Sequence, residues 1–176
     1  DDEDTDGTRA FTINSATGAI TVADADDLNY EDDAEYTLTV TALDGTASDT
    51  ETLVISLTDV DEADVTTPTD SDNDANTLAE GVATGTAAQV TASASDSDGT
   101  TNTITYTITA QSCSGGFAVG SSTGIVTVAS DLDFEVTGAS CTVTIQAASA
   151  DGSDASATFS ITITDVAPTV TDNDVN

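Results

Sequence analysis

Apolar and polar residues alternate along several stretches of the chain. In "YTLTVTAL", which begins at Tyr36, the apolar side chains fall on one face of an extended strand and the threonines on the other. The same period of two recurs in "ITYTITA" at 104–110, "CTVTIQA" at 141–147 and "FSITIT" at 159–164. Alternation with β-branched Thr, Val and Ile predicts strands that have one buried face. No stretch shows a convincing helical period, so the pattern predicts an all-β protein with Gly and Asp turns.

The alternating segments belong to an internal repeat. "FTINSATGAITVA" at 11–23 recurs as "FAVGSSTGIVTVA" at 117–129, and "ISLTDV" at 55–60 recurs as "ITITDV" at 161–166. "LNYE" at 28–31 likewise recurs as "LDFE" at 132–135. A period of about 106 residues fits one β-sandwich. We therefore predict the second half of one repeat at 1–64, a complete repeat at 65–170, and the start of a further repeat at 171–176.

The first repeat lacks the sequence that corresponds to the first three strands of the second. Its apolar faces would then have no facing strands, and isolated half-sheets are not stable in water. Preceding sequence of the same protein could complete it, or another chain could add strands to its open edges. We favour preceding sequence, because the segment 171–176 is too short to supply three strands.

Composition narrows the classes of function. The chain has 33 acids and one base among 176 residues, a formal net charge of −32, and it contains no His. Nucleic acids and anionic membrane surfaces are improbable partners, because both require clustered Lys and Arg. No apolar run is long enough to insert in a membrane, and no signal peptide is present. Without His or Lys there is no Ser-His triad or Schiff base, so we do not expect an enzyme.

A set of motifs in the second repeat points to a known family. Glu80 is followed by "GVATGT", and "ASASDSDGTTNTITY", "FAVGSSTGIVTV", "LDFE" and "ITITDV" then follow in order. This succession resembles the cadherin repeat, particularly the cadherin-like repeats of large bacterial surface proteins and adhesins. The resemblance covers nearly the whole chain. It implies tandem Greek-key β-sandwiches of seven strands, immunoglobulin-like in architecture, that lie at the cell surface and bind calcium between successive repeats.

The resemblance also implies which residues hold calcium. Calcium takes six to eight oxygen ligands, which clustered acids can supply. For the junction between the two repeats, the matching positions are Asn29, Glu31, Asp59, Asp61, Glu62, Asp96, Asp98, Asn102 and Asp151. A second junction after residue 165 would use Glu80, Asp133, Glu135 and Asp165. Ala167 and Pro168 replace the acids that the first linker has at Asp61 and Glu62, so we predict weaker or no occupancy there.

Two further acidic runs are weaker candidates for calcium binding. Asp2, Asp4, Asp6 and Gly7 resemble the front of a calcium loop, but Ile13 stands where an EF-hand carries its bidentate Glu. Asp70, Asp72 and Asp74 form the second run. The alternative for all of these acids is that they keep the surface hydrated, as in proteins from salty water.

Cys113 and Cys141 are the two cysteines of the chain. Both lie in the second repeat, and the first repeat has no counterpart for either. Two unrelated buried thiols are possible, but in an extracellular protein a disulfide is the better interpretation. Closing a loop of this length would stabilise the repeat by roughly 3 kcal/mol.

The leading hypothesis is a structural and adhesive segment of an extracellular array, stiffened at its linkers by calcium and forming a stalk or surface filament. Its partners would be neighbouring repeats or identical chains. The alternative is a binding module for a glycan or a partner protein at the cell surface. It would require exposed aromatic residues, and the chain has three Tyr and four Phe, most at inward positions. A hydrolase with paired carboxylates is a further, weaker alternative.

Overall fold

The computed structural model describes residues 9–168. The chain divides into two compact units, with the boundary between Asp61 and Glu62. We call them the first unit and the second unit and describe each by itself. The domain boundaries at 64 and 170 stay predictions.

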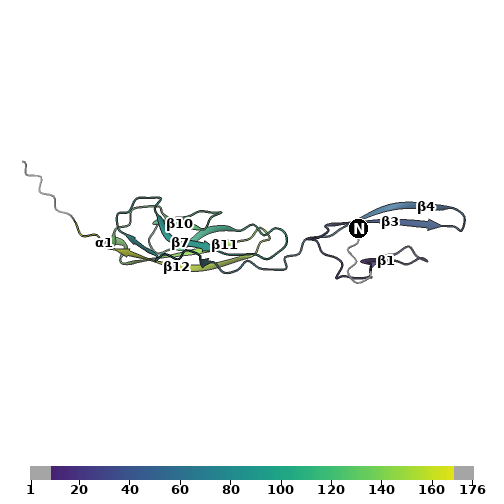
Figure 1. Cartoon of the computed structure of the whole chain (residues 1–176), viewed down its shortest axis with the longest axis horizontal. Helices are drawn as coiled ribbons and strands as arrows, with labels where there is room; N and C mark the ends of the chain where they lie inside the picture. Colours follow the sequence, from purple (N-terminus) through teal and green to yellow (C-terminus); the bar gives the residue numbers. More distant parts are fainter. Residues whose placement is uncertain (1–8, 169–176) are drawn as a thin grey trace, which may run out of the picture. The chain divides into compact units, whose positions relative to one another are not determined.

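The first unit consists of two β-hairpins, which Figure 1 shows at the purple and blue end of the chain. The short hairpin joins β1 (Phe11–Ile13) to β2 (Ile20–Val22), and the long hairpin joins β3 (Glu35–Leu43) to β4 (Ser48–Ser56). In β3, half-buried Tyr36, Leu38 and Val40 alternate with exposed threonines, as predicted. The Phe11 ring packs edge-on against Tyr36, with ring centroids 5.4 Å apart.

The second unit is a β-sandwich of two four-stranded sheets (Figure 1). One sheet has the order β5-β7-β10-β9, formed by Thr69–Asp70, Ala87–Ser93, Ile125–Val128 and Phe117–Val119. The other has the order β6-β12-β11-β8, formed by Thr77–Ala79, Asp154–Thr164, Ser140–Ala148 and Thr105–Gln111. Among the strands within residues 9–168, β6 alone pairs in parallel, against β12. The all-β prediction and the sandwich architecture are therefore confirmed.

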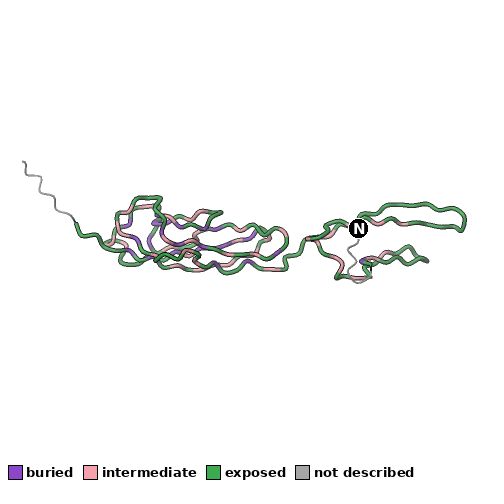
Figure 2. Tube along the Cα trace, viewed as in Figure 1, coloured by how far each residue is buried: buried purple, intermediate pink, exposed green. Residues whose placement is uncertain are grey.

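The core of the second unit lies between these sheets and comes from the inward positions of the predicted alternation. Figure 2 shows the buried residues concentrated in this unit. Val143, Ile145, Ile161 and Val126 are fully buried. Most outward positions of β11 and β12 carry hydroxyl side chains, and some of these pair across the strands, as at Thr144 and Thr158. One apolar face and one polar face are what a sheet in a two-layer sandwich requires.

Two details of the second unit differ from the sequence expectation. Eight strands replace the predicted seven, because the first part of the repeat is divided into β5 and β6, which pair with different sheets. A four-residue helix, α1 (Phe134–Thr137), follows the "LD" of the "LDFE" motif, with Asp133 as its N-cap. One turn is too short to show a helical period, so the sequence pattern could not reveal it.

The predicted disulfide between Cys113 and Cys141 is present. It ties the connection between β8 and β9 to the beginning of β11, and both cysteines are buried. At the position in the first unit that corresponds to Cys141, the chain has Tyr36 instead, because Tyr36 pairs with Ile55 as Cys141 pairs with Ile161. The two units thus stabilise the same position differently, one by a cross-link and the other by an aromatic contact.

Candidate metal centre

Three carboxylates gather at one end of the second unit. Asp96 and Asp98 lie in the loop after β7, and Asp151 lies in the turn between β11 and β12. A carboxylate oxygen of Asp98 and one of Asp151 lie within 4.8 Å of each other. Asp98 is only 4% exposed, which is unusual for an acid. We call these three residues the amino-terminal cluster.

Hydrogen bonds hold the Asp96–Asn102 loop in position. Asp96 Oδ1 accepts from the Asp98 N–H at 3.0 Å, and Asp98 Oδ1 accepts from the Thr100 N–H at 3.2 Å. Asn102 Nδ2 donates to the Asp98 carbonyl at 2.9 Å. Aspartates that accept from the backbone two residues on form Asx-turns, which direct their second oxygen away from the loop. Asp98 Oδ2 accepts from the Glu62 N–H at 3.2 Å, which brings the predicted ligand Glu62 beside the cluster.

The cluster contains oxygens that the protein does not satisfy. Asp96 Oδ2 and Asp151 Oδ2 are buried and accept no hydrogen bond. Asp151 Oδ1 accepts from the Ser153 N–H at 2.6 Å, and this bond is the main reason why the pKa of Asp151 is lowered, so the group stays ionised. Buried charged oxygens without donors are costly unless a cation compensates them. This arrangement fits a hard cation.

In the first unit, two predicted ligands come together. An oxygen of Glu31 and one of Asp59 lie within 4.8 Å of each other, and Glu31 Oε1 is buried and accepts no hydrogen bond. Asn29 shapes this turn, because its Oδ1 accepts from the Glu31 N–H at 3.2 Å and its Nδ2 donates to Asp32 at 2.8 Å. Asp61, the last predicted ligand of this unit, is exposed.

The residues predicted for the second junction also meet. Glu80, Asp133 and Glu135 each place one oxygen within 4.8 Å of the others, and we call them, with Asp165, the carboxyl-terminal cluster. Glu80 is already engaged: Oε2 accepts from the Phe134 N–H at 2.8 Å and Oε1 from the Val166 N–H at 2.7 Å. These bonds, that to Val166 first, lower the pKa of Glu80. Glu80 therefore joins three segments of the fold without a metal.

Glu135 shows that the acids of the carboxyl-terminal cluster repel one another. Its own backbone N–H is the largest single influence and lowers its pKa, but the charge of Glu80, burial, and the neighbours Asp133 and Asp165 together raise it above the ordinary value. A raised pKa means that the ionised carboxylate is repelled by its neighbours. A cation at this cluster would relieve that repulsion.

The Asp70–Asp74 run has a structural use in this fold. Asp70 Oδ1 accepts from the Asp72 and Thr91 N–H groups, and its Oδ2 accepts from Asn76 Nδ2. Asp72 Oδ1 accepts from the Asp74 N–H. These bonds fix the turn between β5 and β6. The other candidate run, Asp2 to Gly7, lies outside the described residues, as does the segment 171–176.

The sequence comparison did not single out Asp44. It precedes Gly45 in the β3–β4 turn, as Asp151 precedes Gly152 in the β11–β12 turn, so the paired segments "ALDG" and "SADG" would have revealed it. Asp44 Oδ1 accepts from the Ala47 and Thr46 N–H groups, the first of which contributes most to a lowered pKa. The first unit therefore carries the same turn acid as the amino-terminal cluster.

Comparisons with known proteins agree with this architecture. Human protocadherin-24 EC1-2 is similar in structure, with a TM-score of 0.53, 16% identity, and coverage of 91% of this chain and 78% of that one. Mouse cadherin-23 EC22-24 gives a TM-score of 0.52 at 21% identity, over 89% of this chain and 50% of that one. Mouse clustered PcdhgC3 EC1-3 gives a TM-score of 0.53 at 23% identity, over 89% of this chain and 51% of that one. At these identities the likeness shows the fold alone.

Two further findings complete the comparison. No curated protein sequence matches the chain. Within residues 9–168, no helix has the length and apolar character that a membrane crossing needs. The model of the cadherin domain matches residues 65–164, which is more than half of the 176 residues. The chain therefore belongs to the cadherin family.

Proposed function

We propose that the chain is a structural and adhesive segment of an extracellular array of cadherin domains, held rigid at its linker by calcium. The observation that carries this proposal is the pair of buried oxygens, Asp96 Oδ2 and Asp151 Oδ2, that accept no hydrogen bond. They lie in a chain with a formal net charge of −32, where few cationic side chains can compensate them.

The donor set favours calcium over other metals. The candidate ligands are carboxylate and amide oxygens, and His is absent, so zinc and copper lack their usual nitrogen ligands. Calcium accepts six to eight oxygens in flexible geometry, whereas magnesium requires a near-ideal octahedron and keeps several waters. Several carboxylates on separate loops match the calcium preference.

Two groups of residues would hold the ion. From the first unit and the linker these are Asn29, Glu31, Asp59 and Asp61, and from the second unit Glu62, Asp96, Asp98, Asn102 and Asp151. Bound calcium would supply the positive charge that the carboxylates lack. The turns at Asn29 and Asp96 hold the neighbouring carboxylates of each unit in place. The proposal requires that the two groups share an ion, in which case calcium would restrict the motion of one unit relative to the other.

The carboxyl-terminal cluster is proposed as a weaker site. Both oxygens of Glu80 already accept backbone N–H groups, so this end is formed before any metal binds. The chain continues into Ala167 and Pro168, which offer no carboxylate. Calcium would therefore bind here more weakly than at the amino-terminal cluster.

The setting would be the cell surface or a secreted filament, with neighbouring repeats or identical chains as partners. The Cys113–Cys141 disulfide supports this location, because disulfides persist in oxidising compartments. The low content of aromatic residues, 4%, offers little for recognition of sugars by stacking.

Calcium titration of the metal-free chain tests the proposal. We expect the melting temperature to rise by roughly 10 °C at a calcium concentration of about 100 Kd, since ligand linkage adds about 2.7 kcal/mol there. We also expect the angular distribution between the units, measured by small-angle scattering, to narrow. EDTA that changes neither the melting temperature nor the scattering curve would refute the proposal.

A pair of variants assigns the effect to the amino-terminal cluster. Asp98→Asn keeps the size of the side chain and removes one charged ligand. We therefore expect calcium affinity to fall at least roughly tenfold, the lower end of what changes around a metal site typically cost. Asp131→Asn is the matched control, because Asp131 is exposed and lies outside both clusters. Equal affinities of the two variants would remove Asp98 from the site.

A further inference from the structure

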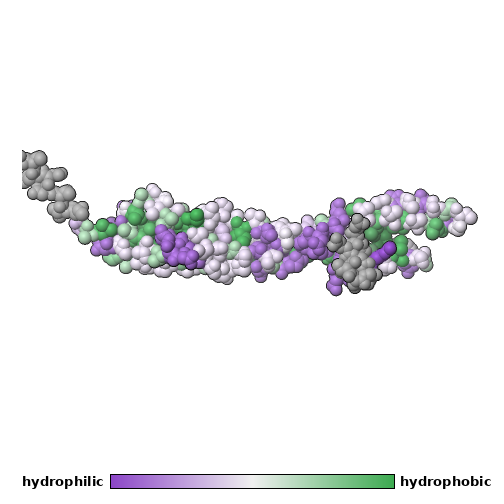
Figure 3. All heavy atoms as spheres, in the orientation of Figure 1, coloured by the Kyte–Doolittle hydropathy of each residue, from purple (hydrophilic) through white to green (hydrophobic). Residues whose placement is uncertain are grey.

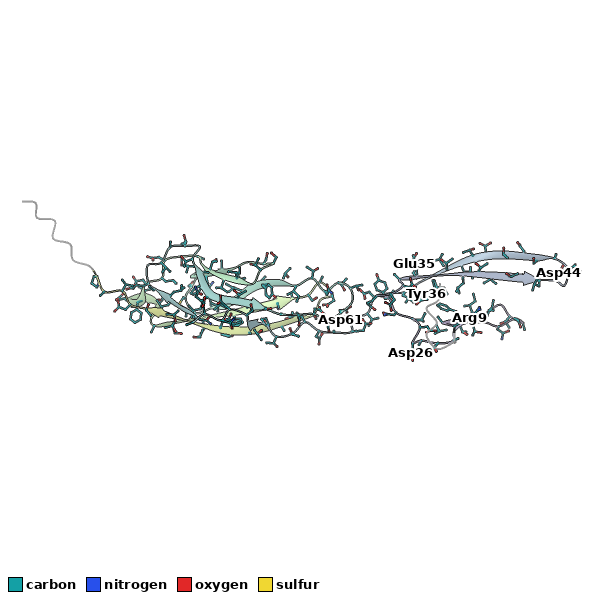
Figure 4. The ribbon with its side chains drawn as sticks, viewed as in Figure 1. Arg9, Asp26, Glu35, Tyr36, Asp44 and Asp61 are labelled. Atoms are coloured by element: carbon teal, nitrogen blue, oxygen red, sulfur yellow. A yellow bond between two sulfur atoms is a disulfide. The ribbon has the colours of Figure 1, made fainter. Side chains whose placement is uncertain are left out.

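A short segment at the beginning of the second unit is bound to the amino-terminal cluster. We call residues 62–66 the entry segment; they lie before β5, and Figure 4 labels Asp61, which directly precedes them. The Glu62 N–H donates to Asp98 Oδ2 at 3.2 Å. Val65 is 5% exposed and its side chain belongs to the hydrophobic core of this unit. The entry segment is therefore held both by the core and by an acid of the cluster.

The hydroxyl group of Ser153 provides a further bond to this segment. Ser153 lies in the turn between β11 and β12, and its Oγ accepts from the Val65 N–H at 3.0 Å. Its own N–H donates to Asp151 Oδ1 at 2.6 Å. One residue thus joins a carboxylate of the amino-terminal cluster to a backbone group of the entry segment, although Val65 and Ser153 are 88 positions apart in sequence.

The second oxygen of Asp151 makes this connection sensitive to charge. Asp151 Oδ2 is buried and accepts no hydrogen bond, and oxygens of Asp98 and Asp151 lie within 4.8 Å of each other. Like charges at this distance repel each other. Figure 3 shows strongly hydrophilic residues gathered at this end of the second unit. A cation that offsets the repulsion would hold Asp151 in place, and with it the N–H and the hydroxyl group of Ser153.

Ser149 connects the same turn to the other acids of the cluster. Its N–H donates to the Ser153 carbonyl at 2.9 Å, and its hydroxyl group donates to the Thr101 carbonyl at 3.3 Å. Because Thr101 belongs to the Asp96–Asn102 loop, these bonds join the turn to the loop that carries Asp98. Separation of the carboxylates would therefore disturb the position of Ser153.

The first unit contains a similar turn without the hydroxyl group. Ala47 directly precedes β4 as Ser153 directly precedes β12, and the Ala47 N–H donates to Asp44 Oδ1 at 3.1 Å. The bond between the turn acid and the backbone therefore forms with alanine at this position. Serine adds the acceptor for the Val65 N–H, so Ser153→Ala should keep the turn and remove only that acceptor.

We propose that Ser153 is a positioning residue that couples cation binding at the amino-terminal cluster to docking of the entry segment. This inference rests on the proposed calcium site and adds the route by which its occupation orders residues 62–66. The route runs from Asp151 through the N–H and the hydroxyl group of Ser153 to the Val65 N–H. Coupling between two sites is reciprocal, so docking must raise calcium affinity by the factor by which calcium favours docking.

Hydrogen exchange of the Val65 amide, measured by NMR in the chain 1–176 with calcium and with EDTA, tests the coupling. We expect calcium to slow this exchange by a factor roughly fivefold larger in the wild type than in Ser153→Ala, because one net hydrogen bond represents about that ratio. Calcium affinity, measured by isothermal titration calorimetry, should fall by a similar factor in the variant. A serine that only stabilised the fold would change the exchange equally with and without calcium.

Two further variants serve as controls for the hydroxyl group. Ser153→Thr retains a hydroxyl group at this position and should restore the calcium dependence of the Val65 amide. Ser156→Ala removes a hydroxyl group from an exposed position of β12 and should behave as the wild type.

The outcomes distinguish this inference from the proposed function. A wild-type chain that binds no calcium would overturn both. A chain that binds calcium, and in which Ser153→Ala responds as Ser156→Ala does, would overturn the coupling alone. The entry segment would then respond to calcium through Glu62 and Asp98 without Ser153.

Discussion

The disulfide offers the sharpest quantitative prediction for the second unit. Cys113 and Cys141 are separated by 28 residues, and both are buried in the core. The loop-closure relation gives an entropy change of about −12 cal/mol/K for the unfolded chain, or about 3.6 kcal/mol at 25 °C. With an unfolding entropy of about 0.2 kcal/mol/K for a domain of this size, reduction should lower the melting temperature by roughly 18 °C.

Thermal unfolding by circular dichroism, with and without a thiol reductant, measures this shift. Reduction breaks the S–S bond and adds a hydrogen to each sulfur but removes no heavy atom from the core, so the difference reports mainly the lost cross-link rather than a lost side chain. The variant Cys113→Ala/Cys141→Ala should melt below the reduced protein, because it also removes buried sulfur atoms.

The first unit contains neither cysteine, so its hydrogen exchange should not respond to the reductant. Oxidised and reduced proteins that melt within about 3 °C of each other would refute the loop-entropy reasoning. In that case the unfolded chain would already hold the two segments close together.

The remaining predictions concern backbone space and pH. Gly124→Ala should destabilise the second unit by more than about 2 kcal/mol, because the new Cβ would collide with the Ala92 carbonyl. Gly115→Ala, in the same unit and with open space around its Cβ, should cost only the left-handed strain of about 1–2 kcal/mol, and equal effects of the two variants in urea unfolding would contradict this. The lowered pKa of Glu80 contributes stability that is present above its unfolded value of 4.5 and lost as pH falls through the folded pKa. Glu80→Gln should therefore flatten the acid limb of the stability curve between neutral pH and pH 2, and an unchanged limb relative to wild type would exclude this role.

The sequence by itself determined several of the strands, which of their side chains face inward, and the correspondence between the two units. Alternation within "YTLTVTAL" predicted β3, and the same pattern predicted β8, β11 and β12, because a period of two is a local property of a half-buried strand. The offset of 106 residues related Phe11 to Phe117, and the two hairpins do share a register. Side-chain alternation leaves little freedom for a strand to slip.

The tertiary structure alone decided how the acids are used. Asp70 and Asp98 both belong to runs of alternating acids, yet Asp70 is satisfied by its own turn and a neighbouring strand, while Asp98 lies buried beside Asp151. The carboxylate of Glu80 likewise accepts hydrogen bonds from the backbone N–H groups of residues 134 and 166. Whether a carboxylate meets a donor or another carboxylate depends on which loops the sandwich brings to one end, and residues 53 or more positions apart carry no local signal of that meeting.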